Sequence, residues 1–264
     1  MTEANQTLDA SQGTQGKLYL VPAPLDFGCD PQTQLQDTLP WGTLSIAARL
    51  QHWICENAKS ARAYLKRVHQ IVPLNHSLQA LNMQVLPHSV HKHGDHNGDF
   101  DARALLAPAE QGHDVGLLSE AGMPAVADPG SSVVRAAHLL GLEVVPLGGP
   151  VSLMLALAAS GLNGQSFAFC GYLPQDALQR AKRIGELESL AIKTGQTQLF
   201  IETPYRNGVL LHALLQTLDP ETRLAVSSGL TLARGVCHSD TVRNWQRRGW
   251  QLDNATPAVF ALGR

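Results

Sequence analysis

Hydrophobic and polar positions alternate in blocks along the middle of the chain, between Val115 and Leu157. Two short apolar runs, Val115–Leu118 and Leu142–Leu147, are separated by a segment, Ser131–Leu140, whose apolar residues fall at helical spacing. A short buried strand that leads through a helix to a second strand is typical of a βαβ unit with a parallel sheet. This stretch therefore predicts an α/β fold.

Both predicted strands end in loops rich in glycine and proline, Ser119–Pro124 and Gly148–Ser152. Ligands of open parallel sheets bind beyond the carboxyl ends of the strands, so the two loops predict a shaped ligand pocket. Ordinary turn chemistry, with Ser119 or Ser152 as a helix cap, explains the same residues equally well.

The rest of the chain continues the pattern of short strands and helices. A first strand at Lys17–Val21 ends at two prolines, a helix at Ser60–Val68 is capped by Ser60, and His88–Asp99 reads as a polar loop. In the second half the pattern predicts strands at 167–169, 198–201, 223–227 and 257–262, and helices at 151–160, 177–190, 209–218 and 242–248.

A boundary near residues 149–165 divides these elements into two α/β halves. We therefore expect an N-terminal domain at 16–149, a C-terminal domain at 150–264, and a disordered polar tail at 1–15.

Composition narrows the class of protein. The 264 residues are 44% hydrophobic and 16% charged with a net charge of −2, so the chain can bury a core and carries no general electrostatic attraction to nucleic acid. The four cysteines are scattered, the N-terminus has no secretory leader, and no apolar run reaches the length of a membrane span. These features predict a cytoplasmic protein with no membrane association.

Candidate acid–base residues cluster in the histidine-rich loop, which contains His88, His91, His93, Asp95 and His96. Such a loop could bind a metal, supply a general base, or simply be solvated. Without a cysteine or a helical HxxxH pair, a solvated loop is favoured over a metal, and we expect no metal site. Glu56 is a further candidate, although a carboxylate at a helix start is also favoured by the helix dipole.

The order of several motifs resembles the tetrapyrrole methylase superfamily of S-adenosylmethionine-dependent methyltransferases, and within it the ribosomal RNA small-subunit methyltransferase I branch. The resemblance runs from about Gly16 to Gly263. It is carried by Gly16–Pro24, Asp95–Asn97, Ser119–Pro124, Asp128–Gly130, Val145–Pro150, Gly171–Pro174 and Ile201–Arg206.

The resemblance implies two α/β domains with S-adenosyl-L-methionine in the cleft between them, a homodimer, and RNA as a substrate. It implies Glu56, Asp95 and His96 as catalytic residues. The implied cofactor-binding residues are Pro24, Ser119, Glu120, Ala121, Gly122, Met123, Pro124, Gly149, Pro150, Ser152, Glu202, Thr256 and Pro257.

Three positions depart from the RNA-methylating branch. Only Glu56 remains of an acidic-Thr-Arg motif, Leu25–Gly28 replaces an Ile-Gly-Asn type sequence, and Met123 replaces a small polar residue. Methylation of a ribose 2′-hydroxyl in ribosomal RNA is the expected reaction. A tetrapyrrole methyltransferase is an alternative that Met123 disfavours, because those branches carry Gly-Asp-Pro at this place. A degenerate, non-catalytic binding protein is the other alternative, whereas the missing GxGxxG disfavours a Rossmann dehydrogenase.

Overall fold

The structure, a computed structural model, describes residues 15–26, 28–93, 95–98 and 100–264. The chain divides into two compact units. The first runs to Ala23 and resumes at Leu39–Gly149; the second consists of Pro24–Thr38 and Pro150–Arg264. Apart from Gln15, the tail predicted at residues 1–15 lies outside the described residues.

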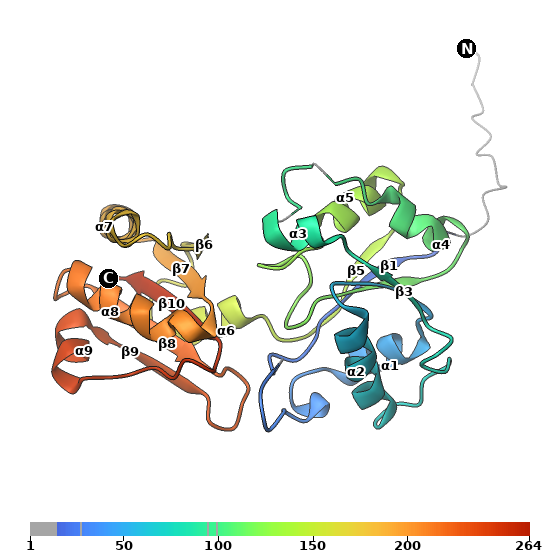
Figure 1. The fold of residues 1–264 in the computed structure, drawn as a ribbon, viewed down its shortest axis with the longest axis horizontal. Coiled ribbons are helices and arrows are strands. Elements are labelled where there is room, and N and C mark those ends of the chain that lie inside the picture. The colour runs from blue at the N-terminus through green and yellow to red at the C-terminus, as the bar shows by residue number, and fades with distance from the viewer. Residues whose placement is uncertain (1–14, 27, 94, 99) are drawn as a thin grey trace, which may run out of the picture. The chain divides into compact units, whose positions relative to one another are not determined.

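The first unit is built on a five-stranded parallel sheet with the strand order β3-β2-β4-β1-β5 (Figure 1). The strands are β1 (Leu18–Val21), β2 (His52–Cys55), β3 (Asn82–Val85), β4 (Val115–Leu118) and β5 (Val144–Pro146). Val115 pairs with Leu18 on one side and His52 on the other, which places β4 centrally. The predicted βαβ unit is present, with β1 between its two strands, and the predicted α/β class is confirmed.

Helices follow most of these strands. They are α1 (Trp41–Arg49), α2 (Ala58–His69), α3 (His88–His93), α4 (Ala107–Glu110) and α5 (Ser131–Leu139). The predicted cap of α2 is wrong: Asn57, not Ser60, is the N-cap, and its Oδ1 accepts from the backbone N–H of Lys59 at 2.8 Å. The loop predicted at His88–Asp99 is also corrected, because its first half forms α3.

The core of the first unit lies between the sheet and α5. Leu18, Ile54 and Leu117 from three adjacent strands are almost completely buried and belong to one cluster with Val133 and Ala136 of α5. β4 is buried along its whole length, as expected for a central parallel strand. This buried sheet fixes the loops that leave its carboxyl edge.

The second unit contains a five-stranded mixed sheet with the order β6-β7-β10-β8-β9. Its strands are β6 (Phe167–Tyr172), β7 (Thr197–Glu202), β8 (Arg223–Ser228), β9 (Val236–Thr241) and β10 (Ala258–Gly263), and its helices are α6 (Ser152–Ser160), α7 (Ala177–Thr194), α8 (Asn207–Thr217) and α9 (Val242–Arg248). β10 runs antiparallel to both of its neighbours. The sequence pattern did not predict β9.

Alternating side chains of this second sheet enter two separate cores. Phe200 and Phe260, stacked with ring centroids 5.8 Å apart, pack in a cluster that also contains residues of α7, α8 and α9. Their neighbours Leu199 and Val259 belong to a second cluster with residues of α6. The period-two alternation of a strand thus matches a sheet covered on both faces.

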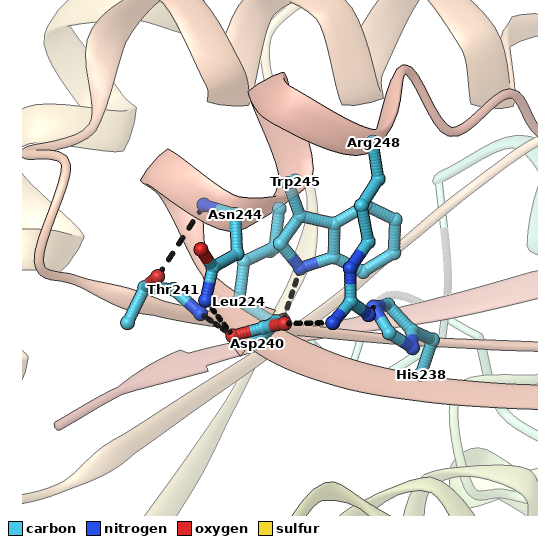
Figure 2. A network of polar contacts seen from close by, with 7 residues as sticks. All are labelled: Leu224, His238, Asp240, Thr241, Asn244, Trp245 and Arg248. Atoms are coloured by element: carbon cyan, nitrogen blue, oxygen red, sulfur yellow. Dashed lines mark hydrogen bonds and ion pairs between the residues drawn. The ribbon is translucent and has the colours of Figure 1, made fainter.

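A polar network joins α9 to β9 and β8 (Figure 2). Trp245 of α9 is buried and donates its Nε1–H to the carbonyl of Leu224 at 2.8 Å. Asp240 of β9 accepts from Asn244 Nδ2 at 2.8 Å and pairs with Arg248 at 3.4 Å.

Among the described residues, no helix is both long and apolar enough to cross a bilayer.

Candidate functional site

The carboxyl edge of the first sheet brings together most of the predicted site residues of the first unit. Glu56 follows β2, Ser119 and Glu120 follow β4, and Gly149 lies in the loop after β5. Because all five strands are parallel, their carboxyl ends lie along one edge of the sheet. The two loops singled out in the sequence therefore share this edge.

The loop after β4 has an unusual backbone. Gly122 has φ +71° and forms an isolated antiparallel bridge with Ala23, with N–H···O distances of 2.9 and 3.1 Å. The bridge connects the loop after β4 to the loop after β1. Glycine suits this position because a positive φ strains other residues.

Ser119 opens the same loop with a buried hydroxyl. Its side chain is 4% exposed, and its Oγ has no hydrogen-bond partner in the described part of the chain. An unsatisfied buried hydroxyl costs about 1–3 kcal/mol, so such an atom suits contact with a polar ligand group. Ala121 and Met123 are half-buried, and Pro124 is buried.

Gly149 is held closely by its surroundings. A Cβ atom at this position would overlap the Pro22 ring and lie 3.2 Å from Leu39 Cδ2. The loop after β5 thus packs so closely against the loop after β1, which begins at Pro22, that position 149 has no room for a side chain. Neighbouring Gly148 is less constrained, since its Cβ would lie 3.4 Å from Pro40.

Three carboxylates interact at the ends of β2 and β4. Glu56 Oε1 accepts from the Glu120 backbone N–H at 3.2 Å, and Glu120 Oε1 accepts from Ser60 Oγ at 3.0 Å. Burial, followed by the charges of Glu56 and Glu120, raises the pKa of Asp128 to about 7. The edge of the sheet here has a strongly negative potential.

A cavity of about 360 Å³ lies beside these carboxylates. Its lining combines acidic, amide, imidazole and apolar side chains: Glu56, Asn57, Val85, Leu86, His88 and Glu120. These residues leave the carboxyl ends of β2, β3 and β4, which are neighbours in the sheet. The cavity therefore occupies the position that parallel sheets use for ligands.

Asp95 lies in a different environment from the one a general base needs. Its carboxylate is 5% exposed and accepts from the Gly130 and Ser132 backbone N–H groups, both at 2.9 Å, and from the Ser131 and Ser132 hydroxyls at 2.7 and 2.6 Å. Burial opposes ionisation, but the hydrogen bonds from Ser132, Ser131 and Gly130 hold the pKa of Asp95 below its usual value. The N-cap residue of α5 has no capping side chain, and the Asp95 carboxylate takes its place. This arrangement favours a positioning role for Asp95.

The histidines near Asp95 are described in part. His96 is exposed, and its carbonyl accepts from Arg135 at 3.3 Å. Among the side chains that the structure describes, no group of three or more potential metal ligands occurs. The side chains of His91 and His93 lie outside the described structure, whereas His88 lines the cavity.

The remaining predicted cofactor residues belong to the second unit. Buried Glu202 pairs with Arg206 at 3.1 Å and accepts from the Thr203 N–H at 2.8 Å, and the Thr256 hydroxyl donates to Asp253 at 2.9 Å. Pro257 accepts from the Gly229 N–H, Pro24 and Pro150 are buried, and Ser152 begins α6 without capping it. Their part in cofactor binding stays a prediction.

The sequence did not predict Asp128 or Asn57 as site residues, although both belong to this edge. Asp128 lies in an Asp-Pro-Gly motif, which is visible in the sequence. Its electrostatic interaction with Glu56 is not visible there, because it depends on the adjacency of β2 and β4. Asn57 was visible only as the residue after a candidate carboxylate.

Comparisons with known proteins agree with this geometry. Residues 48–243 match the family model described as Tetrapyrrole (Corrin/Porphyrin) Methylases. Ribosomal RNA small subunit methyltransferase I of Escherichia coli O157:H7 is 27% identical over 233 residues, which is 88% of this chain and 72% of that protein. Its counterpart in Mesorhizobium japonicum is 35% identical over 149 residues, which is 56% of this chain and 49% of that protein.

A crystal structure of the methyltransferase CobJ has the same fold, with a TM-score of 0.55, 17% identity and 94% of each chain covered. The chain spans about half the length of the curated relatives from Mesorhizobium japonicum and Vibrio cholerae that it matches. The family model, in contrast, covers most of the chain. The chain therefore belongs to the tetrapyrrole (corrin/porphyrin) methylase family.

Proposed function

We propose that this protein is an S-adenosyl-L-methionine-dependent methyltransferase that methylates a ribose 2′-hydroxyl of ribosomal RNA. Family membership and the names of the relatives support methyl transfer to RNA. The single observation that carries the proposal is the carboxyl edge of the first sheet, where the glycine loops after β4 and β5 both begin and the loop after β4 adjoins a cavity with acid–base side chains.

The residues at this edge fit the cofactor. The unpartnered Ser119 hydroxyl offers a hydrogen bond to a polar group, and Gly122 fixes the course of the loop through its two backbone hydrogen bonds to Ala23. When bound, S-adenosyl-L-methionine supplies a methyl group already activated by a sulfonium, so the protein mainly aligns the acceptor with it. The loops Ser119–Pro124 and Gly148–Gly149 would hold the cofactor, and Glu56 would assist the acceptor.

We also propose that the protein is located in the cytoplasm and forms a homodimer. A methyltransferase of ribosomal RNA works where ribosomes are assembled, which supports the cytoplasm. Size-exclusion chromatography with light scattering tests the dimer directly, and a monomer at micromolar concentration would contradict it.

The first experiment is calorimetric titration of the protein with S-adenosyl-L-methionine and S-adenosyl-L-homocysteine. We expect micromolar binding, and we expect Gly122→Trp to abolish it while circular dichroism shows an intact fold. Methyl transfer from labelled cofactor to undermethylated small-subunit RNA then tests the acceptor. Absence of binding of either compound would overturn the proposal and leave the degenerate binding protein as the better account.

A further inference from the structure

The cavity at the ends of β2, β3 and β4 has the size of a pocket for one small molecule. Its volume of about 360 Å³ lies within the range of about 300–1,000 Å³ typical of ligand pockets. Such a cavity can hold one nucleoside but not a folded stretch of RNA. An RNA could therefore enter it only through a single unstacked nucleotide.

The lining offers complementary groups for a nucleoside. Val85 and Leu86 provide an apolar wall for the face of a base. The Asn57 Oδ1 is engaged by the N–H groups of Lys59 and Ser60, at 2.8 and 3.4 Å, which orients its amide and leaves Nδ2 as a donor for a base carbonyl. The carboxylates of Glu56 and Glu120 can accept from amino and hydroxyl groups.

The acidic side chains of the cavity disfavour a phosphate as its occupant. Glu56 and Glu120 both line it, and their charges contribute to the raised pKa of nearby Asp128. Like charges repel more strongly at a partly buried site than in water, so a phosphate would be disfavoured here. The neutral part of a nucleotide, with its hydroxyl and amino donors, meets no such penalty.

The cavity adjoins the loop to which the cofactor is assigned. Glu120 lines the cavity, and Gly122, two residues further on, bridges to Ala23 at the end of β1. In the strand order β3-β2-β4-β1-β5, the cavity lies at the ends of the first three strands, and the Gly149 loop follows the last one. The loop after β4 therefore touches both halves of the site.

We propose that this cavity receives the acceptor ribonucleoside, and that His88 is the group that accepts the proton of its ribose hydroxyl. The inference rests on the proposed function. His88 is the imidazole among the lining residues, and a neutral imidazole is the usual general base near pH 7. The acceptor oxygen would bond to the methyl carbon as the carbon–sulfur bond breaks, its electron pair staying on sulfur and the hydroxyl proton passing to His88.

The pocket is tested by binding, without turnover. Cytidine and uridine at millimolar concentration are added to protein saturated with S-adenosyl-L-homocysteine, and saturation-transfer NMR detects contact. We expect transfer with the wild type and with Val85→Thr, a substitution of nearly equal size. Val85→Trp fills the cavity from an exposed position and should reduce nucleoside affinity at least tenfold without changing affinity for S-adenosyl-L-homocysteine.

The role of His88 is tested by comparing turnover with binding. His88→Gln should lower the rate of methyl transfer to RNA by about 10²–10⁴-fold. Nucleoside contact in NMR should persist. His138→Gln, an exposed substitution on α5, is the matched control and should behave as wild type.

The outcomes separate this inference from the proposed function. If the wild type methylates RNA while Val85→Trp and His88→Gln do so equally well, the acceptor lies elsewhere and this inference is overturned alone. If the wild type shows no nucleoside contact in NMR, the pocket assignment fails. If it binds no S-adenosyl-L-methionine at all, the proposed function fails, and this inference with it.

Discussion

Two adjacent glycines at the end of β5 meet very different surroundings, although the sequence presents them as a pair. A methyl group at position 149 would overlap the Pro22 ring, whereas one at 148 would make an ordinary contact with Pro40. Only Gly149 is therefore required by close packing of backbone against a neighbouring loop.

This difference gives a matched pair of variants. Gly149→Ala should lower the free energy of unfolding by about 1–3 kcal/mol, the usual cost of overpacking, and weaken cofactor binding because the loop must shift. Gly148→Ala should change stability by less than about 0.5 kcal/mol. Urea denaturation and calorimetry measure both effects, and equal behaviour of the two variants would contradict the packing argument.

Asp95 offers a second test at the level of one side chain. Asp95→Asn leaves donors of Gly130 and Ser132 without a charged acceptor and should cost about 2–3 kcal/mol of unfolding free energy. Because the folded pKa is lowered, this contribution is present above the unfolded pKa of about 4 and is lost as the pH falls further. Denaturation at several pH values measures it.

The control for Asp95 is Asp101→Asn. Asp101 is exposed, and its partner Arg103 is exposed as well, so the substitution should have little effect on stability. A loss equal to that of Asp95→Asn would show that carboxylate burial is not the cause. If Asp95→Asn abolished methyl transfer without loss of stability, the result would support the predicted catalytic role of Asp95 over a positioning role.

Among the elements, α9 is packed through two buried side chains, of which Trp245 is the larger. Trp245 is 1% exposed and donates to the Leu224 carbonyl, so it joins α9 to β8 in the core (Figure 2). Trp245→Ala should lower the free energy of unfolding by about 3–5 kcal/mol. Trp41→Ala, at a position 65% exposed in α1, should change it by less than about 0.5 kcal/mol. Thermal unfolding that ranks the two variants equally would contradict this assignment.

The elements also show where prediction from sequence succeeds. β4 and α5 were predicted because β4 is a continuous apolar run and α5 has apolar residues at helical spacing, and α9 was predicted as well. β9 was not, since this edge strand, Val236–Thr241, pairs only with β8 and is never fully buried. α3 was read as a loop because His88–His93 has no apolar period.

Part of the candidate site was predictable for the same reason. The loops after β4 and β5 carry glycine and proline signals in the sequence, and Glu56 is the residue that remains of the acidic-Thr-Arg motif. The meeting of Glu56 with Glu120 and Asp128 was not predictable, because it follows from β2 lying beside β4. Local periodicity carries no information about the order of strands in a sheet.

At the scale of the whole molecule, Asp128 links stability to pH. An aspartate titrates near pH 4 in an unfolded chain and at about 7 here, so between these values the folded state retains a proton that the unfolded state releases. The free energy of unfolding should therefore fall as the pH rises from about 4 to 7, and this part of the stability is not regained above 7.

Asp128→Asn removes the titrating group and should flatten this fall. We expect the variant to be more stable than wild type at pH 8, by on the order of 2 kcal/mol, and close to it at pH 4.5. Denaturant unfolding without cofactor measures the difference. Glu110→Gln, exposed on α4, should follow the wild type throughout, and an Asp128→Asn curve parallel to wild type would refute the coupling.

The chain enters the second unit twice, first for Pro24–Thr38 and again from Pro150 onwards. In that unit Thr33 donates to the Thr231 carbonyl and Arg234 to the Asp30 carbonyl. On a ribosome, where chains fold from the N-terminus, Pro24–Thr38 emerges early and must wait for partners made near the end. The residues of the first unit up to Gly149 are thus made before the second unit can be completed, because Pro24–Thr38 has to wait for Thr231 and Arg234.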